Sequence, residues 1–176
     1  MKIKNQKFFH KVYECPKFQT WSGAGLPHQH HYGDGGLMKH TLEVLEYARA
    51  NAHVASSYHG HEIDMDVLEL SCLYHDLGKI HDYEKVDGVW QKSPHCRNIH
   101  HISRSAIIWS DDFRESDIKD EKLFEDVLHC ILAHHGGREY GSPVAPKSRE
   151  AWILHLSDNL SARMSDADTN DLIKNK

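Results

Sequence analysis

The sequence contains no long run of apolar residues. No stretch approaches the ~20 consecutive apolar residues that a membrane-spanning helix needs. The basic start, residues 1–7, is not followed by the apolar core of a secretion signal. We therefore expect a soluble, cytoplasmic protein with no membrane partner. Its 176 residues are the length of one ordinary domain, and the sequence shows neither an internal repeat nor a dividing linker.

Cysteine is also scarce, and none of the four cysteines belongs to a CxxC pair. Cys72 and Cys130 fall inside apolar helical patterns, which indicates small core residues. A disulfide framework is therefore not expected, in keeping with a reducing compartment.

Positive charge is not in excess, since the net charge is −5. This balance argues against a general nucleic-acid-binding surface but leaves room for a small local one. Histidine, in contrast, is abundant, with 17 residues scattered along the chain, which excludes a terminal tag. Some histidines are expected on the surface: His53, His59, His61 and His81. Because histidine is a common metal ligand and proton carrier near pH 7, the others point to chemistry.

Helical spacing of apolar residues is the only convincing periodicity. It predicts helices over residues 37–53, 65–79, 99–109, 121–134 and 149–164, with a short helix around Phe8–Tyr13 that Pro16 would end. Gly78 is a plausible helix C-cap and Ser148 a plausible N-cap. Residues 20–36, 80–98 and 141–146 are expected as loops, with room for a small hairpin at 86–89. The prediction is an all-α bundle with long loops and at most a small hairpin.

The sharpest local motif is the doublet His75-Asp76 at the end of an apolar helix. Neighbouring helix residues point about 100° apart, so both side chains can reach one ion only near the helix end. The alternative is a structural one, in which an aspartate ends the helix beside a half-buried histidine.

His40 and Asp158 each lie on the apolar face of a helix. A buried ionisable group in such a position needs a partner. For His40 the alternative to a ligand role is a core histidine bonded to a carbonyl. For Asp158 it is a buried salt bridge with Arg163 or Lys79.

Two further histidine pairs stand at helix ends. His100-His101 lies at a helix start, and His134-His135 lies at a helix end before two glycines. Helical bundles commonly build metal sites from side chains that project inward from several helices. Mixed imidazole and carboxylate ligands suit Mn, Fe, Zn, Co or Ni better than Ca or Mg.

The ordered set of motifs resembles the HD superfamily of metal-dependent phosphohydrolases, whose signature is H…HD…D. The motifs are Gly-Gly-Leu-Met-Lys-His-Thr ending at Thr41, His75-Asp-Leu-Gly-Lys79, His100-His-Ile102, Ala133-His-His-Gly136 and Leu156-Ser-Asp-Asn-Leu160. The resemblance covers roughly residues 28–163. It implies an HD-type helical bundle, with residues 28–165 as the hydrolase domain, 1–27 as an N-terminal helix and loop packed on it, and 166–176 as a polar tail.

One branch of the superfamily is more similar still. Residues 139–151, the pair His30-His31 and the Asp158-Asn-Leu segment resemble the HD domain of bacterial 3′–5′ exoribonucleases that combine an OB-fold with an HD domain. Ser161 departs from that branch, which carries aspartate there. The first 25 residues are too few for an OB-fold, so capture of long RNA by a separate domain is not expected.

The resemblance also implies roles for individual residues. His40, His75, Asp76 and Asp158 would bind a first divalent ion, and Asp76 would bridge to a second ion held by His101 and His134, with His135 close by. Lys79 would approach a substrate phosphate; the alternative is a solvated lysine at a helix C-terminus.

The expected reaction is hydrolysis of a phosphate ester by metal-activated water. Asp76, Lys79 and His31 are the candidate catalytic residues, and Lys79, Arg104, Arg138 and His30 the candidate phosphate contacts. His30 or His31 could act as general acid or orient the phosphate; an exposed loop pair is the alternative. A nucleotide or short oligonucleotide is the expected substrate, with a phosphodiester favoured over a monoester.

Two other functions share the same ligands. One is an HD-type di-iron oxygenase, and the other is a non-catalytic nucleotide-binding sensor. The sequence also leaves a homo-oligomer open.

Overall fold

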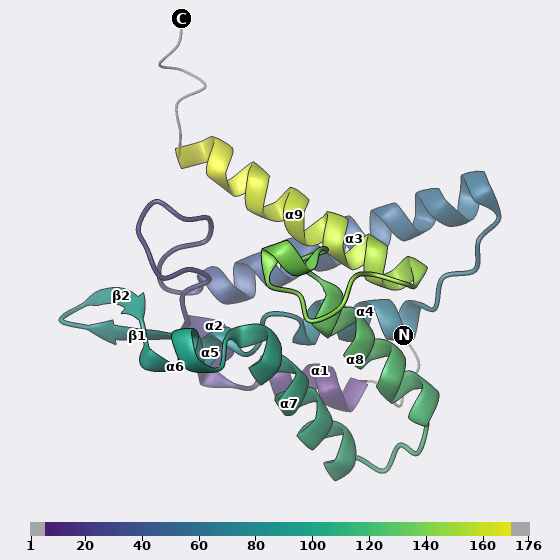
Figure 1. Ribbon diagram of the computed structural model, residues 1–176, viewed down its shortest axis with the longest axis horizontal. Helices are drawn as coiled ribbons and strands as arrows, with labels where there is room; N and C mark the ends of the chain where they lie inside the picture. Colours follow the sequence, from purple (N-terminus) through teal and green to yellow (C-terminus); the bar gives the residue numbers. More distant parts are fainter. Residues whose placement is uncertain (1–5, 170–176) are drawn as a thin grey trace, which may run out of the picture.

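The computed structural model describes residues 6–169, with side chains up to Ser165. The elements are α1 (Gln6–Tyr13), α2 (Pro16–Thr20), α3 (Gly36–His59), α4 (Met65–Tyr74), α5 (Lys79–Asp82), β1 (Tyr83–Val86), β2 (Val89–Lys92), α6 (Pro94–Asn98), α7 (His101–Glu115), α8 (Glu121–Ala133), the 3₁₀ turn η2 (Arg138–Tyr140) and α9 (Arg149–Thr169). In the described part of the chain the only sheet is the antiparallel hairpin β1–β2. The predicted all-α class with a small hairpin is confirmed (Figure 1).

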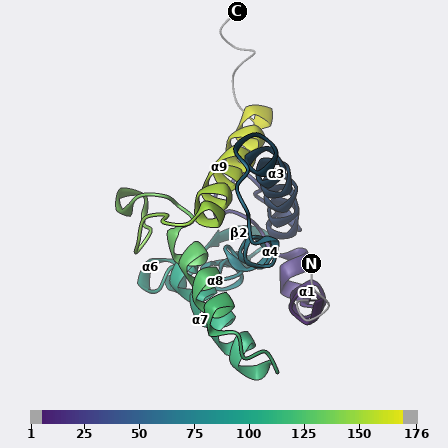
Figure 2. The same cartoon turned by 90° about the vertical axis from the view of Figure 1, so that its right-hand side faces the viewer.

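The bundle is built around α4. Every residue from Asp66 to Tyr74 is buried, because α1 packs on one side of α4 and α8 on the other (Figure 2). The two longest helices, α3 and α9, lie side by side in both views and close a third side (Figures 1 and 2). A helix covered on all sides is expected to be largely apolar, and of the charged residues in α4 the buried Glu69 pairs with Arg49 of α3 at 2.8 Å.

Several boundaries differ from the prediction. Helix α3 continues to His59 rather than to about residue 53, and α7 continues to Glu115 rather than 109. Three short α-helices were not predicted, α2, α5 and α6. Helices α2 and α6 each begin at a proline, a residue that suits the first turn of a helix. Helix α9 passes Met164 and reaches Thr169, so the predicted polar tail is helical in part, and residues 170–176 lie outside the described residues.

Gly78 plays a different part from the predicted helix C-cap. Helix α4 ends at Tyr74, and Gly78 has a right-handed φ of −60° just before α5. A Cβ at this position would lie 2.3 Å from the carbonyl oxygen of His101. The Gly78 N–H also donates to Ser105 Oγ at 2.8 Å. Glycine is therefore needed so that the turn after α4 can touch the start of α7.

The hairpin holds the loop that precedes α3. The rings of Trp21 and Trp90 meet edge to face, with centroids 4.9 Å apart. Trp90 Nε1 donates to Asp34 at 2.6 Å, and the Tyr32 hydroxyl contacts the Trp90 backbone. The loop of residues 21–35 is thus fastened at both of its ends.

Residues 6–169 include no helix long and apolar enough to cross a membrane. All four cysteines are free thiols, and Cys72 and Cys130 are fully buried as predicted.

Candidate metal centre

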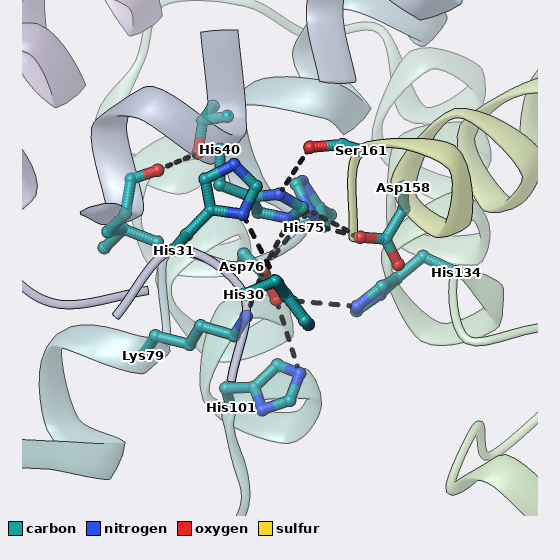
Figure 3. A network of polar contacts seen from close by, with 12 residues as sticks. His30, His31, His40, His75, Asp76, Lys79, His101, His134, Asp158 and Ser161 are labelled. Atoms are coloured by element: carbon teal, nitrogen blue, oxygen red, sulfur yellow. Dashed lines mark hydrogen bonds and ion pairs between the residues drawn. The ribbon is translucent and has the colours of Figure 1, made fainter. Parts of the chain in front are cut away.

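Five segments far apart in the sequence deliver imidazoles or carboxylates to one place, and three of them supply His40, His75-Asp76 and Asp158 (Figure 3). His40 lies in the first turns of α3 and is fully buried between Leu37 and Val44. His75 and Asp76 follow the last residue of α4, and Asp158 projects from α9. The turn at the end of α4 lets the adjacent His75 and Asp76 approach one point from different directions, as the doublet predicted.

The first ligand group consists of His40, His75, Asp76 and Asp158, whose donor atoms all lie within 4.8 Å of one another. His40 Nε2 is 3.1 Å from both Asp76 Oδ2 and Asp158 Oδ1. His75 Nε2 is 3.3 Å from His40 Nε2 and 3.4 Å from Asp76 Oδ2. Two imidazole nitrogens and two carboxylate oxygens therefore face a single small volume.

The second ligand group consists of His101, His134 and His135, again within 4.8 Å. His101 Nε2 is 3.3 Å from His135 Nε2. Two of its members also face Asp76, because Asp76 Oδ1 lies 3.3 Å from His101 Nε2 and 3.7 Å from His134 Nε2. One oxygen of Asp76 thus faces the first group and the other faces the second.

Two buried atoms of this cluster have no hydrogen-bond partner, Asp76 Oδ1 and His134 Nε2. A buried polar atom left unpaired costs free energy, so each such atom calls for a missing partner. A cation between them would satisfy both, and imidazole with carboxylate is a donor set that divalent transition metals accept. The residues present therefore fit a metal centre.

The other ring nitrogens of these histidines are fixed by hydrogen bonds. His75 Nδ1 donates to the Cys72 carbonyl at 2.8 Å, His134 Nδ1 to the Ile131 carbonyl at 2.6 Å and His135 Nδ1 to the Tyr140 carbonyl at 3.0 Å. Such contacts fix the tautomer and leave the lone pair on Nε2, as metal-ligating histidines require.

Burial and neighbouring charges set the protonation of the cluster. Burial alone would raise the pKa of Asp76 and of Asp158, but nearby Lys79 and His75 for Asp76, and His40 for Asp158, hold both below their usual range. Burial lowers the pKa of His101 to about 3 and that of His135 to about 4. At neutral pH the carboxylates are thus ionised and these two imidazoles are neutral, the states that bind metals.

Lys79 is a buried member of the site rather than a solvated lysine. Its side chain is 8% exposed, and its Nζ lies 2.7 Å from Asp76 Oδ2. Burial opposes its charge, but the Asp76 carboxylate raises the pKa of Lys79 above its usual range. A fixed ammonium therefore lies beside the carboxylate that the two ligand groups share.

His30 and His31 both lie against the first group, and the centroid of the His31 ring is 4.8 Å from that of His40 (Figure 3). The His31 ring is buried, and its Nε2 donates to Glu43 Oε2 at 2.9 Å. The His30 ring is half-buried with its centroid 5.7 Å from that of His40, and burial together with Lys79 lowers its pKa to about 4. The alternative of an exposed loop pair is therefore wrong, since His31 is buried and His30 half-buried.

The two candidate arginines are placed differently. Arg104, half-buried on α7, donates through Nε to His95 at 3.0 Å. Arg138 is exposed on η2. Within residues 6–165, the ion pairs of Asp76 go to neither arginine but to His40, His75, Lys79, His101 and His134.

Two acidic residues beside the site escaped sequence reasoning, Glu43 and Asp82. Ser161 donates to Glu43 Oε2 and lies 3.0 Å from His40 Nδ1. Since the one Ser161 proton goes to Glu43, His40 Nδ1 must be the donor in the second contact. Glu43 follows His40 by three residues, a helical spacing that could have signalled its position.

This geometry agrees with comparisons to known proteins. The family model described as "HD domain" matches residues 37–163, a span that includes both ligand groups. The chain belongs to the HD-domain family.

Its relatives include the 3′–5′ exoribonuclease YhaM of Bacillus subtilis (strain 168), with 35% identity over 138 residues, 77% of this chain and 41% of the relative. The dihydroneopterin 2′,3′-cyclic phosphate phosphodiesterase of Methanocaldococcus jannaschii is 28% identical over 174 residues, 93% of this chain and 61% of the relative. The chain thus spans about two fifths to three fifths of these relatives. The resemblance to the exoribonuclease branch is confirmed. No solved structure matches the chain.

Proposed function

We propose that this protein is a metal-dependent phosphohydrolase that cleaves phosphodiester bonds in short oligonucleotides or nucleotides. The observation that carries the proposal is the position of Asp76, whose two oxygens face two separate groups of imidazoles. Shared carboxylates of this kind suit a pair of ions about 3.5–4 Å apart, the arrangement of many phosphate-ester hydrolases. We further propose that residues 28–165 form the hydrolase domain.

In this proposal His40, His75, Asp76 and Asp158 hold the first ion. Asp76, His101, His134 and His135 hold the second. Bound ions of this type lower the pKa of a coordinated water toward neutrality and neutralise charge on the phosphate. The mixed ligands favour Mn, Fe, Ni, Co or Zn over Mg.

The remaining side chains act on the substrate. Lys79 donates a hydrogen bond to a phosphate oxygen from its buried position beside Asp76. The lowered pKa of His30 leaves its ring neutral at pH 7 and therefore a poor general acid. We therefore assign His30 the other candidate role, which is to orient the phosphate. We assign to His31, bonded to Glu43, the task of holding the loop instead of a direct catalytic role. Arg138 stays a candidate phosphate contact.

The choice of a phosphodiester is supported by the relatives. One is named as an exoribonuclease and the other as a cyclic-phosphate phosphodiesterase, and both names describe cleavage of a diester. Their sequence identity to this chain, 35% and 28%, supports the bond type more than the particular molecule.

The test starts with metal analysis of protein purified without added metal. A panel then follows, with a short RNA, a short DNA, a 2′,3′-cyclic nucleotide and a nucleoside monophosphate, each with Mn, Mg, Fe(II), Co, Ni and Zn. We expect turnover of a diester, and loss of bound metal and activity together in His75→Ala and Asp76→Ala. His53→Ala, at an exposed position on α3, is the matched control.

Three results would overturn the proposal. Metal retained with full activity in either site variant would contradict the ligand assignment. Nucleotide binding with manganese but no turnover of any diester would indicate a sensor. Iron-dependent oxygen uptake without hydrolysis would indicate an oxygenase.

A further inference from the structure

A second histidine–aspartate network lies behind His101, on the side away from Asp76. Its centre is Asp82, the last residue of α5, whose side chain is fully buried. Helices α5, α6 and the start of α7 pack together here (Figure 1). The His101 N–H donates to Asp82 Oδ2 at 2.9 Å, and His101 Nδ1 lies 3.2 Å from the same oxygen.

The network continues outward from Asp82 through His95 to Arg104. His95 Nδ1 lies 2.7 Å from Asp82 Oδ1. Arg104 Nε donates to His95 Nε2 at 3.0 Å. Because a guanidinium can only donate, His95 Nε2 must be the acceptor, and its proton must be on Nδ1, facing Asp82. Arg104 thereby fixes the tautomer of His95.

Asp82, His100 and His101 could by proximity alone be taken for a third metal site. The hydrogen bonds argue against it. Both oxygens of Asp82 already accept from N–H groups, one from His95 and the other from His101. A carboxylate whose two oxygens both accept hydrogen bonds orients the groups that donate them. Carboxylates behind metal-bound histidines act in this way.

We propose that Arg104, His95 and Asp82 form a positioning chain that holds His101 in the Nδ1–H tautomer with Nε2 directed at the second ion position. The inference rests on the proposed function, in which His101 is a ligand. His101 Nε2 lies 3.3 Å from both Asp76 Oδ1 and His135 Nε2. A ring free to rotate or to exchange its proton would lose that orientation.

The alternative role for Asp82 is to cap α7. The His100 side chain makes no capping bond, so the His101 N–H depends on Asp82. Asp82→Asn removes the charge that attracts the imidazole proton, and its single carbonyl oxygen can accept from His101 or from His95 but not from both. Arg104→Gln leaves both Asp82 oxygens in place, so this variant tests the chain without removing the helix cap.

The chain also gives Arg104 a role other than phosphate binding. If Arg104 acts through His95, Arg104→Gln lowers the affinity for the second ion and leaves the KM for substrate unchanged at saturating metal. If Arg104 instead touches the substrate, KM rises and the affinity for both ions is unchanged. Arg97→Gln, at an exposed position on α6, is the matched control.

The first experiment is a manganese titration of metal-free full-length protein followed by calorimetry. Wild-type protein should take up two ions in two steps. His101→Ala identifies the second step and His40→Ala the first. We expect Asp82→Asn to weaken the second step by roughly 10–100-fold and leave the first unchanged, with a smaller loss of the same step in Arg104→Gln. Asp87→Asn, in the exposed hairpin turn, should match wild type.

The second experiment needs no metal. Histidine-ring ¹⁵N NMR of the metal-free protein should show His101 as a single Nδ1–H tautomer in wild type and a tautomer mixture in Asp82→Asn. If Asp82→Asn does not fold, Arg104→Gln at the half-buried end of the chain is measured in its place.

The outcomes separate the two proposals. Wild-type protein that takes up no ion overturns the proposed function, whereas the NMR tautomers still test the orientation of His101. Unchanged tautomers together with an unchanged second step in both Asp82→Asn and Arg104→Gln overturn the positioning chain alone.

Discussion

Replacing Asp76 by asparagine is the most direct perturbation of this site. The substitution keeps the shape of the side chain but removes the charge that faces both ligand groups. Asp76 is 2% exposed and ionised at neutral pH, since Lys79 and His75 lower its pKa against the opposing effect of burial. Asp76→Asn therefore removes one anion from the centre of a buried cluster.

The magnitude follows from Lys79, whose Nζ lies 2.7 Å from Asp76 Oδ2 and whose side chain is 8% exposed. Removing one partner of a buried ion pair costs about 3–5 kcal/mol, because the other charge is left uncompensated. In a domain of this size each kcal/mol lowers the melting temperature by about 2–4 °C. We therefore expect the metal-free variant to melt roughly 6–20 °C below wild type.

The assay is thermal unfolding of chelator-treated protein near pH 7.5, with metal binding measured in parallel. The double variant Asp76→Asn, Lys79→Met removes both charges and should recover more than half of the loss. Asp111→Asn, which breaks an exposed pair with Arg114 at 3.7 Å, should cause little change. A single variant that melts with wild type, or that still binds two ions tightly, would refute the reasoning.

Lowering the pH should destabilise the metal-free protein, because burial holds the pKa of His101 near 3 and that of His135 near 4. Below about pH 6.5 these histidines bind protons in the unfolded chain but not in the folded protein, so the free energy of unfolding falls as the pH drops toward 4. Urea unfolding at several pH values measures this change. A free energy of unfolding that does not vary with pH would contradict the prediction. Ser161→Ala removes the acceptor of His40 Nδ1 and should lower the manganese affinity of the first binding step roughly 10-fold. A calorimetric titration that matches wild type would contradict this prediction.

Much of the site could be predicted from the sequence because its ionisable residues interrupt the apolar faces of helices. His40 interrupts the apolar face of α3, and Asp158 does the same on α9. A charged or polar side chain on a buried face needs a partner, so each signalled a contact that the sequence could not name. The structure supplies the missing distances, 3.1 Å from His40 Nε2 to each of Asp76 and Asp158.

The residues that support the ligands could not be foreseen in the same way. Asp82 lies in a segment predicted to be irregular. Its partner His95 comes from α6, and Arg104, which donates to His95, comes from α7. Their association depends on α6, a five-residue helix whose sequence is too short to show a period. The end of α3 was missed for a related reason: the helix continues past Ala52 to His59 with no buried residue, and apolar spacing gives no signal there.

One carboxylate serving both ligand groups ties their occupancies together. In the proposed two-ion site, an ion held by either group would draw charge from Asp76 and repel a second cation, while it would also align the remaining oxygen for that cation. If repulsion prevails, a preparation that averages one equivalent per molecule would consist mainly of singly filled molecules; if alignment prevails, it would be a mixture of vacant and doubly filled molecules. Stoichiometry for this protein is best expressed as a distribution, resolved by native mass spectrometry, before any rate is divided by enzyme concentration.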